Sequence, residues 1–364
     1  MAIPKYRKWQ RYFVLKMEIR ESEERFSLLQ KFLMENALGD FQVTPLADDC
    51  SYRRYFRAKS NDVSFVVMDA PPEKEKTKPF IEISKLLNSY GFSAPKVYKA
   101  DPVKGFLILE DFGDETYTKA LSEDKDEVSL YSFAIDLLVN LGSRNYKEEI
   151  TFLPKYDRAK LLEEVLLFLD WYLVPRLKIA ISEPTRKEFL STWEICLNRF
   201  VDESQNILVL RDYHVDNLMY LSDRDDLGSC GLLDFQDAVQ GPASYDVVSL
   251  LQDSRRDIQP SLERKMLDRY FNGMGKNINQ ESFMNAYYAL GTQRALKVFG
   301  IFTRQSLKYG NHQYLDHIPR LWTHTLANLA TPHMRPLQEW LLNNVSEDAV
   351  NAESNLNISG LKCF

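Results

Sequence analysis

One change of pattern along the chain constrains its fold more than any other feature. Between about residues 40 and 110, short β-rich runs alternate with turn residues and one helical stretch, whereas the rest of the 364 residues is mostly helical by period. A single β-rich island interrupts the helical part, at Ile207–Leu210, Met219–Leu221 and Leu232–Phe235. This pattern predicts an α+β chain with a small sheet-plus-helix lobe and a larger, mainly helical lobe. A cleft between two such lobes is a favoured place for a ligand.

The boundaries of the elements follow from their period and from flanking turn residues. In the small lobe we expect a helix over 23–38, a hairpin of Tyr55–Ala58 and Val63–Met68, a helix over 79–90, and strands at 97–99 and 106–109. In the large lobe we expect helices at 125–142, 157–179, 184–201, 244–255, 260–272, 279–306, 317–327 and 335–343. The predicted organisation is an extension at 1–22, a small lobe at 23–110, a large lobe at 111–345 and a tail at 346–364.

Composition and charge exclude several classes of protein. Forty-six basic and 52 acidic residues leave a net charge of −6, which is not typical of a protein that binds nucleic acid. The four cysteines have no CxxC spacing and the five histidines no HExxH motif, so we expect neither a disulfide framework nor a zinc site of these types. No apolar run reaches the roughly 18 residues of a membrane span. We therefore expect a cytoplasmic protein that binds no nucleic acid and has no membrane span; its oligomeric state stays open.

The residues that can perform chemistry gather in the β island. A strand leads into a loop that carries Asp212, Asn217 follows five residues later, and a second hairpin ends at Asp234-Phe235. An aspartate on such a loop can orient a substrate hydroxyl, and an Asn and a second Asp can supply oxygen ligands for Mg²⁺ on nucleotide phosphates. The D-x-x-x-x-N spacing followed by D-F is typical of kinase catalytic loops. The plainer interpretation is a set of turn-forming polar residues between strands.

This segment resembles the aminoglycoside phosphotransferase-like kinases. Those enzymes phosphorylate small-molecule sugar or alcohol substrates and are related to the protein kinases. The resemblance implies a protein-kinase-like bilobal fold that uses ATP and Mg²⁺, with Asp212 as the catalytic aspartate and Asn217 and Asp234 as magnesium ligands. The block Leu232–Asp253 is similar to the family's segment after the metal aspartate. Within that block we expect Asp246 to be a structural anchor near a helix start.

A narrower resemblance covers about residues 40–345. The blocks SYRRYFR, VVMDAPPEKE, LRDYHVDNLMYL and LATPHMRPLQEWL, which begin at Ser51, Val66, Leu210 and Leu329, look like the bacterial anomeric amino-sugar kinases. Those enzymes phosphorylate the anomeric hydroxyl of N-acetylmuramate and N-acetylglucosamine in cell-wall recycling. Two alternatives stay open: a kinase for another small hydroxylated acceptor, such as an aminoglycoside or a choline-like alcohol, and a pseudokinase that only binds a ligand or partner.

The sequence departs from the kinase pattern where phosphates should bind. The segment Leu46–Tyr55 contains no glycine, and Val66-Val67-Met68-Asp69 stands where a phosphate-contacting lysine is expected at the end of a strand. Arg53 and Arg54 are our candidates for the missing cation, because guanidinium groups suit phosphate oxygens. Both arginines would otherwise form a solvated strand edge. Elsewhere Leu210 stands where many relatives have His, and Gln236 follows Asp234-Phe235 in place of Gly.

Further candidates surround the expected nucleotide and acceptor. Glu110 and Phe112 lie in the linker that is placed to meet an adenine, where backbone groups would make the contacts. For the acceptor we expect Arg211, His214 and Asp216 beside Asp212, and Asp170 with Trp171 as a sugar subsite that combines a carboxylate with an aromatic face. The alternatives are a buried structural histidine at 214, and a core tryptophan beside a solvated aspartate at 170–171.

Overall fold

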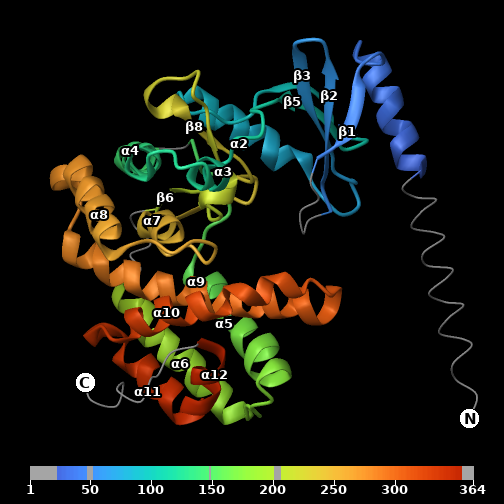
Figure 1. Ribbon diagram of the computed structural model, residues 1–364. Helices are drawn as coiled ribbons and strands as arrows, with labels where there is room; N and C mark the ends of the chain where they lie inside the picture. Colours follow the sequence, from blue (N-terminus) through green and yellow to red (C-terminus); the bar gives the residue numbers. More distant parts are fainter. Residues whose placement is uncertain (1–22, 47–51, 147–148, 201–205, 355–364) are drawn as a thin grey trace, which may run out of the picture. The chain divides into compact units, whose positions relative to one another are not determined.

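The chain divides after Gly113 into two units, each with a core of its own (Figure 1). The computed structural model describes residues 23–46, 52–146, 149–200 and 206–354. The predicted extension at 1–22, the last part of the predicted tail and most of the segment 46–51 ahead of the arginines lie outside the described residues. The predicted α+β class is confirmed, with an antiparallel sheet in the first unit and mainly helices in the second.

The first unit is built around an antiparallel five-stranded sheet of order β1-β2-β3-β5-β4. Its strands are β1 (Gln42–Pro45), β2 (Arg54–Ser60), β3 (Val63–Asp69), β4 (Val97–Asp101) and β5 (Phe106–Glu110). β2 and β3 form the predicted hairpin, in which Ser60 pairs with Val63 and Asn61 has a φ of +51°. Asparagine tolerates this left-handed conformation better than most residues, which explains the position of the turn.

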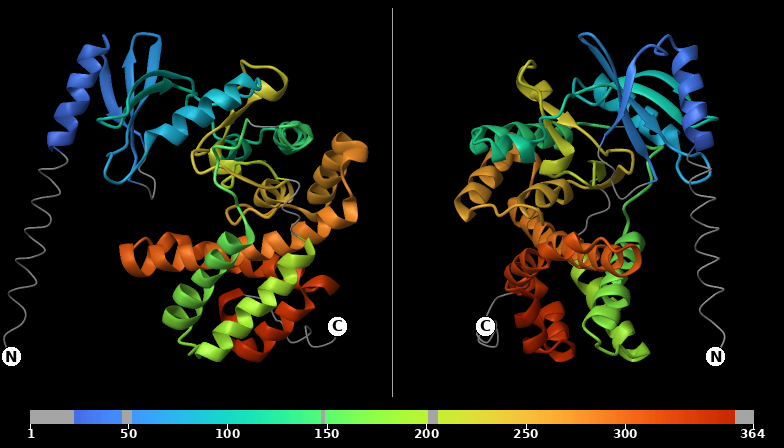
Figure 2. Two further views of the ribbon diagram at one scale, coloured as in Figure 1. Left: turned by 180° about the vertical axis from the view of Figure 1, so that it is seen from behind. Right: turned by 45° about the vertical axis from the view of Figure 1, so that its right-hand side comes forward.

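Different helices cover the two faces of this sheet. A helix at residues 23–35 buries Leu29, Phe32 and Leu33 against Ala58, Val67, Phe106 and Ile108. α2 (Thr77–Ser89), with buried Phe80, Ile83 and Leu87, lies on the opposite side of the sheet from that helix (Figure 1 and Figure 2). Because side chains alternate along a strand, neighbouring residues of β2 or β3 face different helices.

The second unit consists of helices around two short antiparallel ribbons. Before the ribbons come α3 (Tyr117–Ser122), α4 (Glu127–Ser143), α5 (Arg158–Leu167), a π-helical segment at Phe168–Arg176 and α6 (Glu183–Phe200). The ribbons pair β6 (Asn206–Val209) with β9 (Val239–Pro242) and β7 (Leu218–Tyr220) with β8 (Cys230–Leu232). After them come α7 (Ser244–Leu251), α8 (Pro260–Met274), α9 (Gln280–Tyr309), α10 (Ile318–Leu329), α11 (Arg335–Asn344) and α12 (Glu347–Ser354). α12 lies within the residues predicted as a tail.

α9 organises the core of the second unit and lies across several helices (Figure 2). The ring of Phe299 on α9 is 4.6 Å from that of Tyr172 and 5.0 Å from that of Trp322, and the Trp322 indole N–H donates to the Tyr172 hydroxyl at 2.8 Å. Beside this cluster, a Cβ on Gly300 would lie 2.4 Å from the Leu167 carbonyl oxygen. Glycine therefore permits the close approach of α9 to α5.

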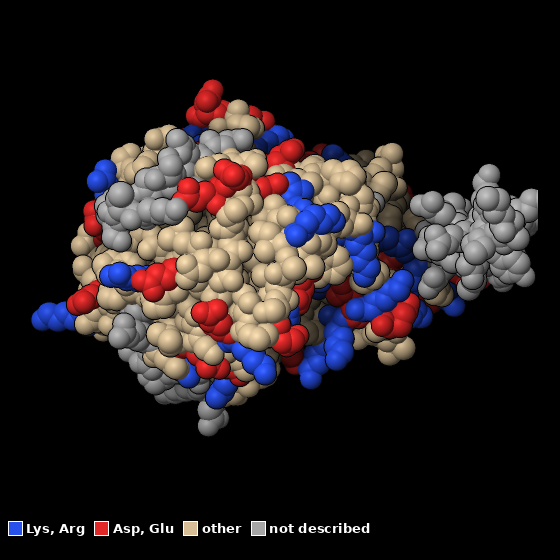
Figure 3. All heavy atoms as spheres, turned by 90° about the horizontal axis from the view of Figure 1, so that it is seen from below, with Lys and Arg blue, Asp and Glu red and all other residues tan. Residues whose placement is uncertain are grey.

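Among the described residues, no helix is both long and apolar enough to cross a bilayer. Figure 3 shows acidic and basic side chains together on the face it presents, so that face carries mixed charge.

Candidate active site

The loop between β6 and β7, Leu210–Asn217, carries Asp212 and is here called the Asp212 loop. The pairs β6–β9 and β7–β8 fix its two ends. Within it, the backbone N–H of Asp212 donates to the Leu210 carbonyl at 2.9 Å, and Arg211 has a φ of +70°. A left-handed conformation at a residue other than glycine costs about 1–3 kcal/mol, and it persists only where the surroundings enforce it.

Asp246, in the first turn of α7, enforces this conformation. Its carboxylate accepts from the backbone N–H of Leu210 at 2.6 Å and from that of Arg211 at 2.9 Å. Asp246 is 2% exposed; burial raises its pKa to about 7, the two backbone hydrogen bonds oppose this rise, and the charge of Asp212 adds to it. Asp246 is an anchor, as expected, but the backbone that it anchors belongs to the Asp212 loop.

The Asp212 carboxylate is unengaged among the described residues, whereas the Asn217 amide is held on its nitrogen side. The Asp212 carboxylate is partly exposed, and it makes no hydrogen bond or ion pair with any residue that the structure describes. The Asn217 amide nitrogen donates to the Asp212 carbonyl at 2.9 Å and lies 3.3 Å from Nε2 of His214. These contacts engage the amide nitrogen, and no hydrogen bond engages the amide oxygen among the described residues. The Asp212 carboxylate is thus available to accept a hydrogen bond from an incoming hydroxyl.

Asp234 follows β8, and a backbone hydrogen bond of the preceding residue brings it close to Asn217. The N–H of Leu233 donates to the Asn217 carbonyl at 2.9 Å, and Asp234 has a φ of +54°. The Gln236 amide donates to Oδ1 of Asp234 at 2.6 Å, which orients the carboxylate. The structure thus brings together the two predicted metal ligands.

The donor set of this pair fits a nucleotide-bound Mg²⁺. Amide and carboxylate oxygens are hard ligands of the kind Mg²⁺ prefers, and Mg²⁺ commonly takes its other ligands from phosphates and water. Within the described ranges, no cluster of three or more His, Cys, Asp or Glu could hold a metal by itself. Asn217 and Asp234 together offer one amide and one carboxylate ligand, which leaves the other positions of such an ion to phosphate oxygens and water.

The Arg211 side chain belongs to a largely buried network of hydrogen bonds and ion pairs that packs against the Asp212 loop. Its guanidinium donates to Glu164 at 2.8 Å and lies 5.1 Å from the Tyr156 ring centre. Glu164 also accepts from the Tyr156 hydroxyl and pairs with Lys297 at 3.4 Å. Burial raises the pKa of Glu164, but Lys297, Arg211 and the hydrogen bonds outweigh it and hold the pKa below its ordinary value. Our sequence reasoning did not single out Lys297, although it interrupts the apolar run Ala295–Phe302.

His214 and Asp216 occupy different environments. His214 is 4% exposed; burial lowers its pKa well below the usual range, and the charges of Arg255 and Arg294 add to the effect. Its Nδ1 is buried without a hydrogen-bond partner among the described residues. Asp216 is exposed, pairs with Arg255 at 2.7 Å and accepts from Thr118 of α3. The first is thus a neutral buried ring and the second a surface carboxylate.

In the first unit, the two candidate arginines face opposite sides of the sheet. Arg54 pairs across the hairpin with Asp69, on the face that is covered by the helix at 23–35. Its guanidinium donates to Asp69 at 2.5 Å, and Arg25 of that helix donates to the other carboxylate oxygen at 2.9 Å. Asp69 is fully buried. Arg54 and Arg25 therefore form a clamp in which each guanidinium binds one oxygen of the buried Asp69 carboxylate. Arg25 was not identified as a partner from the sequence.

Arg53 lies on the other face. It is 9% exposed and pairs with Glu75, ahead of α2, at 3.0 Å. In kinases the phosphate-binding cation pairs with an acid on the helix that corresponds to α2. Glu82, on α2 itself, makes only an exposed pair with Lys78 at 3.6 Å, as an ordinary helix-surface residue would. The α2 face thus offers Arg53 with Glu75.

The predicted linker residues follow the end of β5. The Glu110 carboxylate accepts from the Lys96 backbone N–H at 3.2 Å, and Phe112 is partly exposed. Between them, Asp111 binds Arg57 of β2 at 2.7 and 2.9 Å. Burial raises the pKa of Asp111, but the Arg57 guanidinium and neighbouring donors outweigh it and hold the pKa low. This ion pair fastens the segment to the sheet.

Asp170 and Trp171 lie on the π-helical segment after α5. Asp170 is exposed and forms a two-bond ion pair with Arg186 of α6, at 2.5 and 3.1 Å. Trp171 is partly exposed. The contacts of Asp170 therefore run to α6, and no hydrogen bond links it to the described residues of the Asp212 loop.

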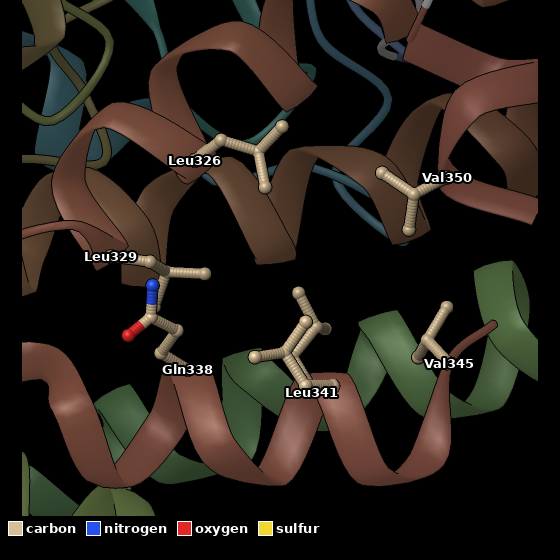
Figure 4. A pocket seen from close by; sticks show the side chains of 7 residues that line it. Leu326, Leu329, Gln338, Leu341, Val345 and Val350 are labelled. Atoms are coloured by element: carbon tan, nitrogen blue, oxygen red, sulfur yellow. The ribbon is translucent and has the colours of Figure 1, made fainter. Parts of the chain in front are cut away.

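A hollow lies among the last helices, between α10, α11 and α12 (Figure 4). Its lining is aliphatic apart from Gln338, with Leu326, Leu329, Leu341 and Val350 pointing inward. Because this lining offers no acid, base or cation, the hollow cannot support the chemistry that the Asp212 loop can.

Comparisons with known proteins agree with this geometry. Residues 42–277 match the phosphotransferase enzyme family, APH. The chain is 31% identical to an N-acetylmuramate/N-acetylglucosamine kinase of Caulobacter vibrioides, over 88% of this chain and 96% of the relative. It is 36% identical to a Pseudomonas aeruginosa protein of the same name, over 82% of this chain and 88% of the relative.

Solved structures share the fold at lower identity. An ADP-bound aminoglycoside phosphotransferase, APH(2'')-Ib, aligns with a TM-score of 0.53 and 15% identity, over 82% of this chain and 96% of the other. A Plasmodium vivax ethanolamine kinase aligns with a TM-score of 0.59 and 12% identity, over 83% and 84% of the two chains. At these identities the similarity establishes the fold and does not identify the substrate. The family match and the similarity to curated relatives over most of their length identify the chain as a member of the APH phosphotransferase family, and thus as a kinase.

Proposed function

We propose that this kinase transfers the γ-phosphate of ATP to the anomeric hydroxyl of an N-acetylated amino sugar, N-acetylmuramate or N-acetylglucosamine. The observation that carries the proposal is the Asp212 loop: a carboxylate without partners among the described residues, on a strained loop that Asp246 enforces. The choice of acceptor is supported by the names of the relatives at 31% and 36% identity. Such a reaction belongs in the cytoplasm, where ATP is available, and would serve cell-wall recycling.

Each residue at the loop has a distinct part in the proposed reaction. Asp212 orients the acceptor hydroxyl for in-line attack and accepts its proton as the new bond forms. Asn217 and Asp234 would hold Mg²⁺, which supplies charge neutralisation on the transferred phosphoryl group when it is bound. Arg211, through Glu164 and Lys297, supports the loop from beneath and is a positioning residue.

For the nucleotide phosphates we favour Arg53 over Arg54. Arg53 lies on the face of the sheet that α2 covers and already pairs with an acid, as the cation of a kinase does. Arg54 is bound to buried Asp69 on the opposite face. Glu110 and Phe112 stay candidates for the neighbourhood of the base, and His214, Asp216, Asp170 and Trp171 stay candidates for contacts with the sugar.

The test is nucleotide consumption with Mg²⁺ against N-acetylmuramate, N-acetylglucosamine, glucosamine, choline and kanamycin, with ATP and GTP compared. Asp212→Asn, which keeps the size of the side chain, is the blank. We expect turnover on the N-acetyl sugars alone, and none above background in the variant. Turnover on choline or kanamycin and not on the sugars would contradict the proposed acceptor. Full activity of Asp212→Asn would contradict the proposed mechanism.

A further inference from the structure

A second buried carboxylate holds the Asp212 loop, at the end that carries Asn217. Asp253 lies just past the end of α7 and is fully buried. One of its oxygens accepts from the backbone N–H of Arg255 at 2.9 Å, which closes a local turn. The other oxygen accepts from the backbone N–H of Val215 at 3.4 Å, 38 positions earlier in the sequence. This second contact joins the segment after α7 to the Asp212 loop.

The partner of Asp253 opens the turn that ends at the proposed metal ligand. Residues Val215–Asn217 form a single 3₁₀ turn, and the Asn217 N–H donates to the His214 carbonyl at 2.9 Å. The first N–H groups of a helical turn have no partner within the turn itself. Leaving a buried N–H without an acceptor is costly, so a carboxylate at this point favours the turn over other conformations of the segment. A change in the turn would move the Asn217 side chain.

A side-chain contact strengthens the same junction. At 3.4 Å the hydrogen bond to Asp253 is long, but the Arg255 guanidinium pairs with Asp216, the middle residue of the turn, at 2.7 Å. The segment after α7 is itself held by another helix, since Arg320 of α10 donates to the Ser254 carbonyl at 2.6 Å. Two contacts thus run from one fixed segment to neighbouring residues of the turn.

The two buried aspartates therefore hold different parts of one loop. Asp246 binds the backbone just ahead of Asp212, and Asp253 binds the backbone just ahead of Asn217. We propose that Asp253 is a positioning residue for the metal ligand, because it holds the turn from which Asn217 would contribute to Mg²⁺ binding. This inference rests on the proposed function, in which Asn217 is a ligand of that ion. Asp246 then affects the rate of transfer, and Asp253 the binding of the metal–nucleotide complex.

Nucleotide binding with and without Mg²⁺, measured by calorimetry in the absence of any sugar, tests this division. In Asp253→Asn the amide has one acceptor oxygen, and the shorter, local bond to Arg255 should keep it. We expect this variant to bind the ATP analogue AMP-PNP about tenfold more weakly in the presence of Mg²⁺, the effect of one lost hydrogen bond to a charged group. Without the metal, its affinity should stay within about twofold of wild type.

The matched control is Asp257→Asn, in the same segment. The Asp257 carboxylate is exposed, pairs with Arg320 at 2.8 Å and makes no hydrogen bond with the described residues of the Asp212 loop. This control should bind AMP-PNP as wild type does under both conditions. Arg255→Met is a second variant with a partly exposed side chain, and it should weaken only the Mg²⁺-dependent binding, by about three- to fivefold, as the loss of an exposed ion pair would.

Two results would overturn the inference. One is Mg²⁺-dependent binding by Asp253→Asn within about twofold of wild type, and the other is equal weakening with and without the metal. If thermal unfolding shows that Asp253→Asn does not fold, Arg255→Met decides by the same criteria. Wild-type binding that does not depend on Mg²⁺ would refute the metal role of Asn217, and this inference with it. Turnover of the N-acetyl sugars by the wild-type enzyme tests the proposed acceptor separately.

Discussion

Replacing Asp246 with asparagine tests whether catalysis requires the conformation of the Asp212 loop that the Asp246 carboxylate holds in place. The carboxylate accepts two backbone N–H bonds, at 2.6 Å from Leu210 and 2.9 Å from Arg211. An asparagine has one oxygen, so one of the two buried N–H groups would face an NH₂ group. A hydrogen bond to a charged group contributes about 1.5–3 kcal/mol, so the enforced loop should lose about 2–3 kcal/mol relative to relaxed alternatives.

The expected effect is on the rate. If only the enforced loop reacts, 2–3 kcal/mol corresponds to a fall in kcat of about 30- to 150-fold. The control is Asp126→Asn: Asp126 also accepts two backbone N–H bonds, at 3.2 Å each, but as the exposed N-cap of α4. Asparagine caps helices as well as aspartate does, so the control should retain wild-type kcat. A kcat for Asp246→Asn within about threefold of wild type would refute the reasoning.

The pH dependence gives the same residue a second test. Because only ionised Asp246 can accept both bonds, wild-type kcat should rise as pH passes through its pKa of about 7, and Asp246→Asn should lack this limb. Stability should change in the opposite sense. The folded-state pKa is raised above the ordinary 3.8, so the stabilisation that this group contributes is complete below pH 3.8 and is lost as pH rises through about 7. Kinetics and thermal unfolding between pH 5 and 8 measure both trends, and identical profiles in the two proteins would contradict the role of Asp246.

Two further predictions concern the nucleotide. Asp234→Asn should raise the Mg²⁺ concentration for half-maximal activity by about tenfold or more, because the amide keeps one ligand oxygen and loses the charge. Measurements of nucleotide affinity with and without Mg²⁺ check this prediction. An unchanged metal requirement would remove Asp234 from the metal site. Arg53→Met should raise the KM for ATP about tenfold with little loss of stability, whereas Arg54→Met should leave that KM unchanged and lower the free energy of unfolding by about 1–2 kcal/mol, since Asp69 would lose one partner. The reverse result would mean that the two faces of the sheet have been assigned wrongly.

The candidate site residues could be predicted from the sequence where they lie close together along the chain. Asp212, Asn217 and Asp234 lie within one β island, and the structure joins the last two through the bond between Leu233 and Asn217. Asp246 was recognised as an anchor, but its targets lie 35 and 36 positions away in the sequence. No periodicity reports a contact of that kind.

The choice between Arg53 and Arg54 shows where sequence reasoning ends. The two are adjacent and chemically identical, and only the register of β2 against β3 places one opposite Asp69. The clamp on Asp69 also needs Arg25, 44 positions earlier, on a helix that was predicted without any such role. Position on a face, and not residue type, separates the structural arginine from the functional candidate.

Several elements escaped prediction for local reasons. β1 is a short, mostly exposed edge strand that ends in Pro45, and β9 ends in Gly241-Pro242, so neither shows an apolar β pattern. α3 has only six residues, too few for a helical period. The longer helices, such as α4 and α9, begin and end within three residues of their predicted bounds, because their apolar stripes are long.

The position of the phosphate on the product tests the central claim most directly. With the wild-type enzyme, ATP and N-acetylglucosamine, the account predicts one sugar monophosphate whose phosphorus couples to the anomeric proton in a ³¹P NMR spectrum. The same reaction with Asp212→Asn should give no product. Phosphate on any other hydroxyl of the sugar, or the same product from the Asp212→Asn variant, would contradict the account.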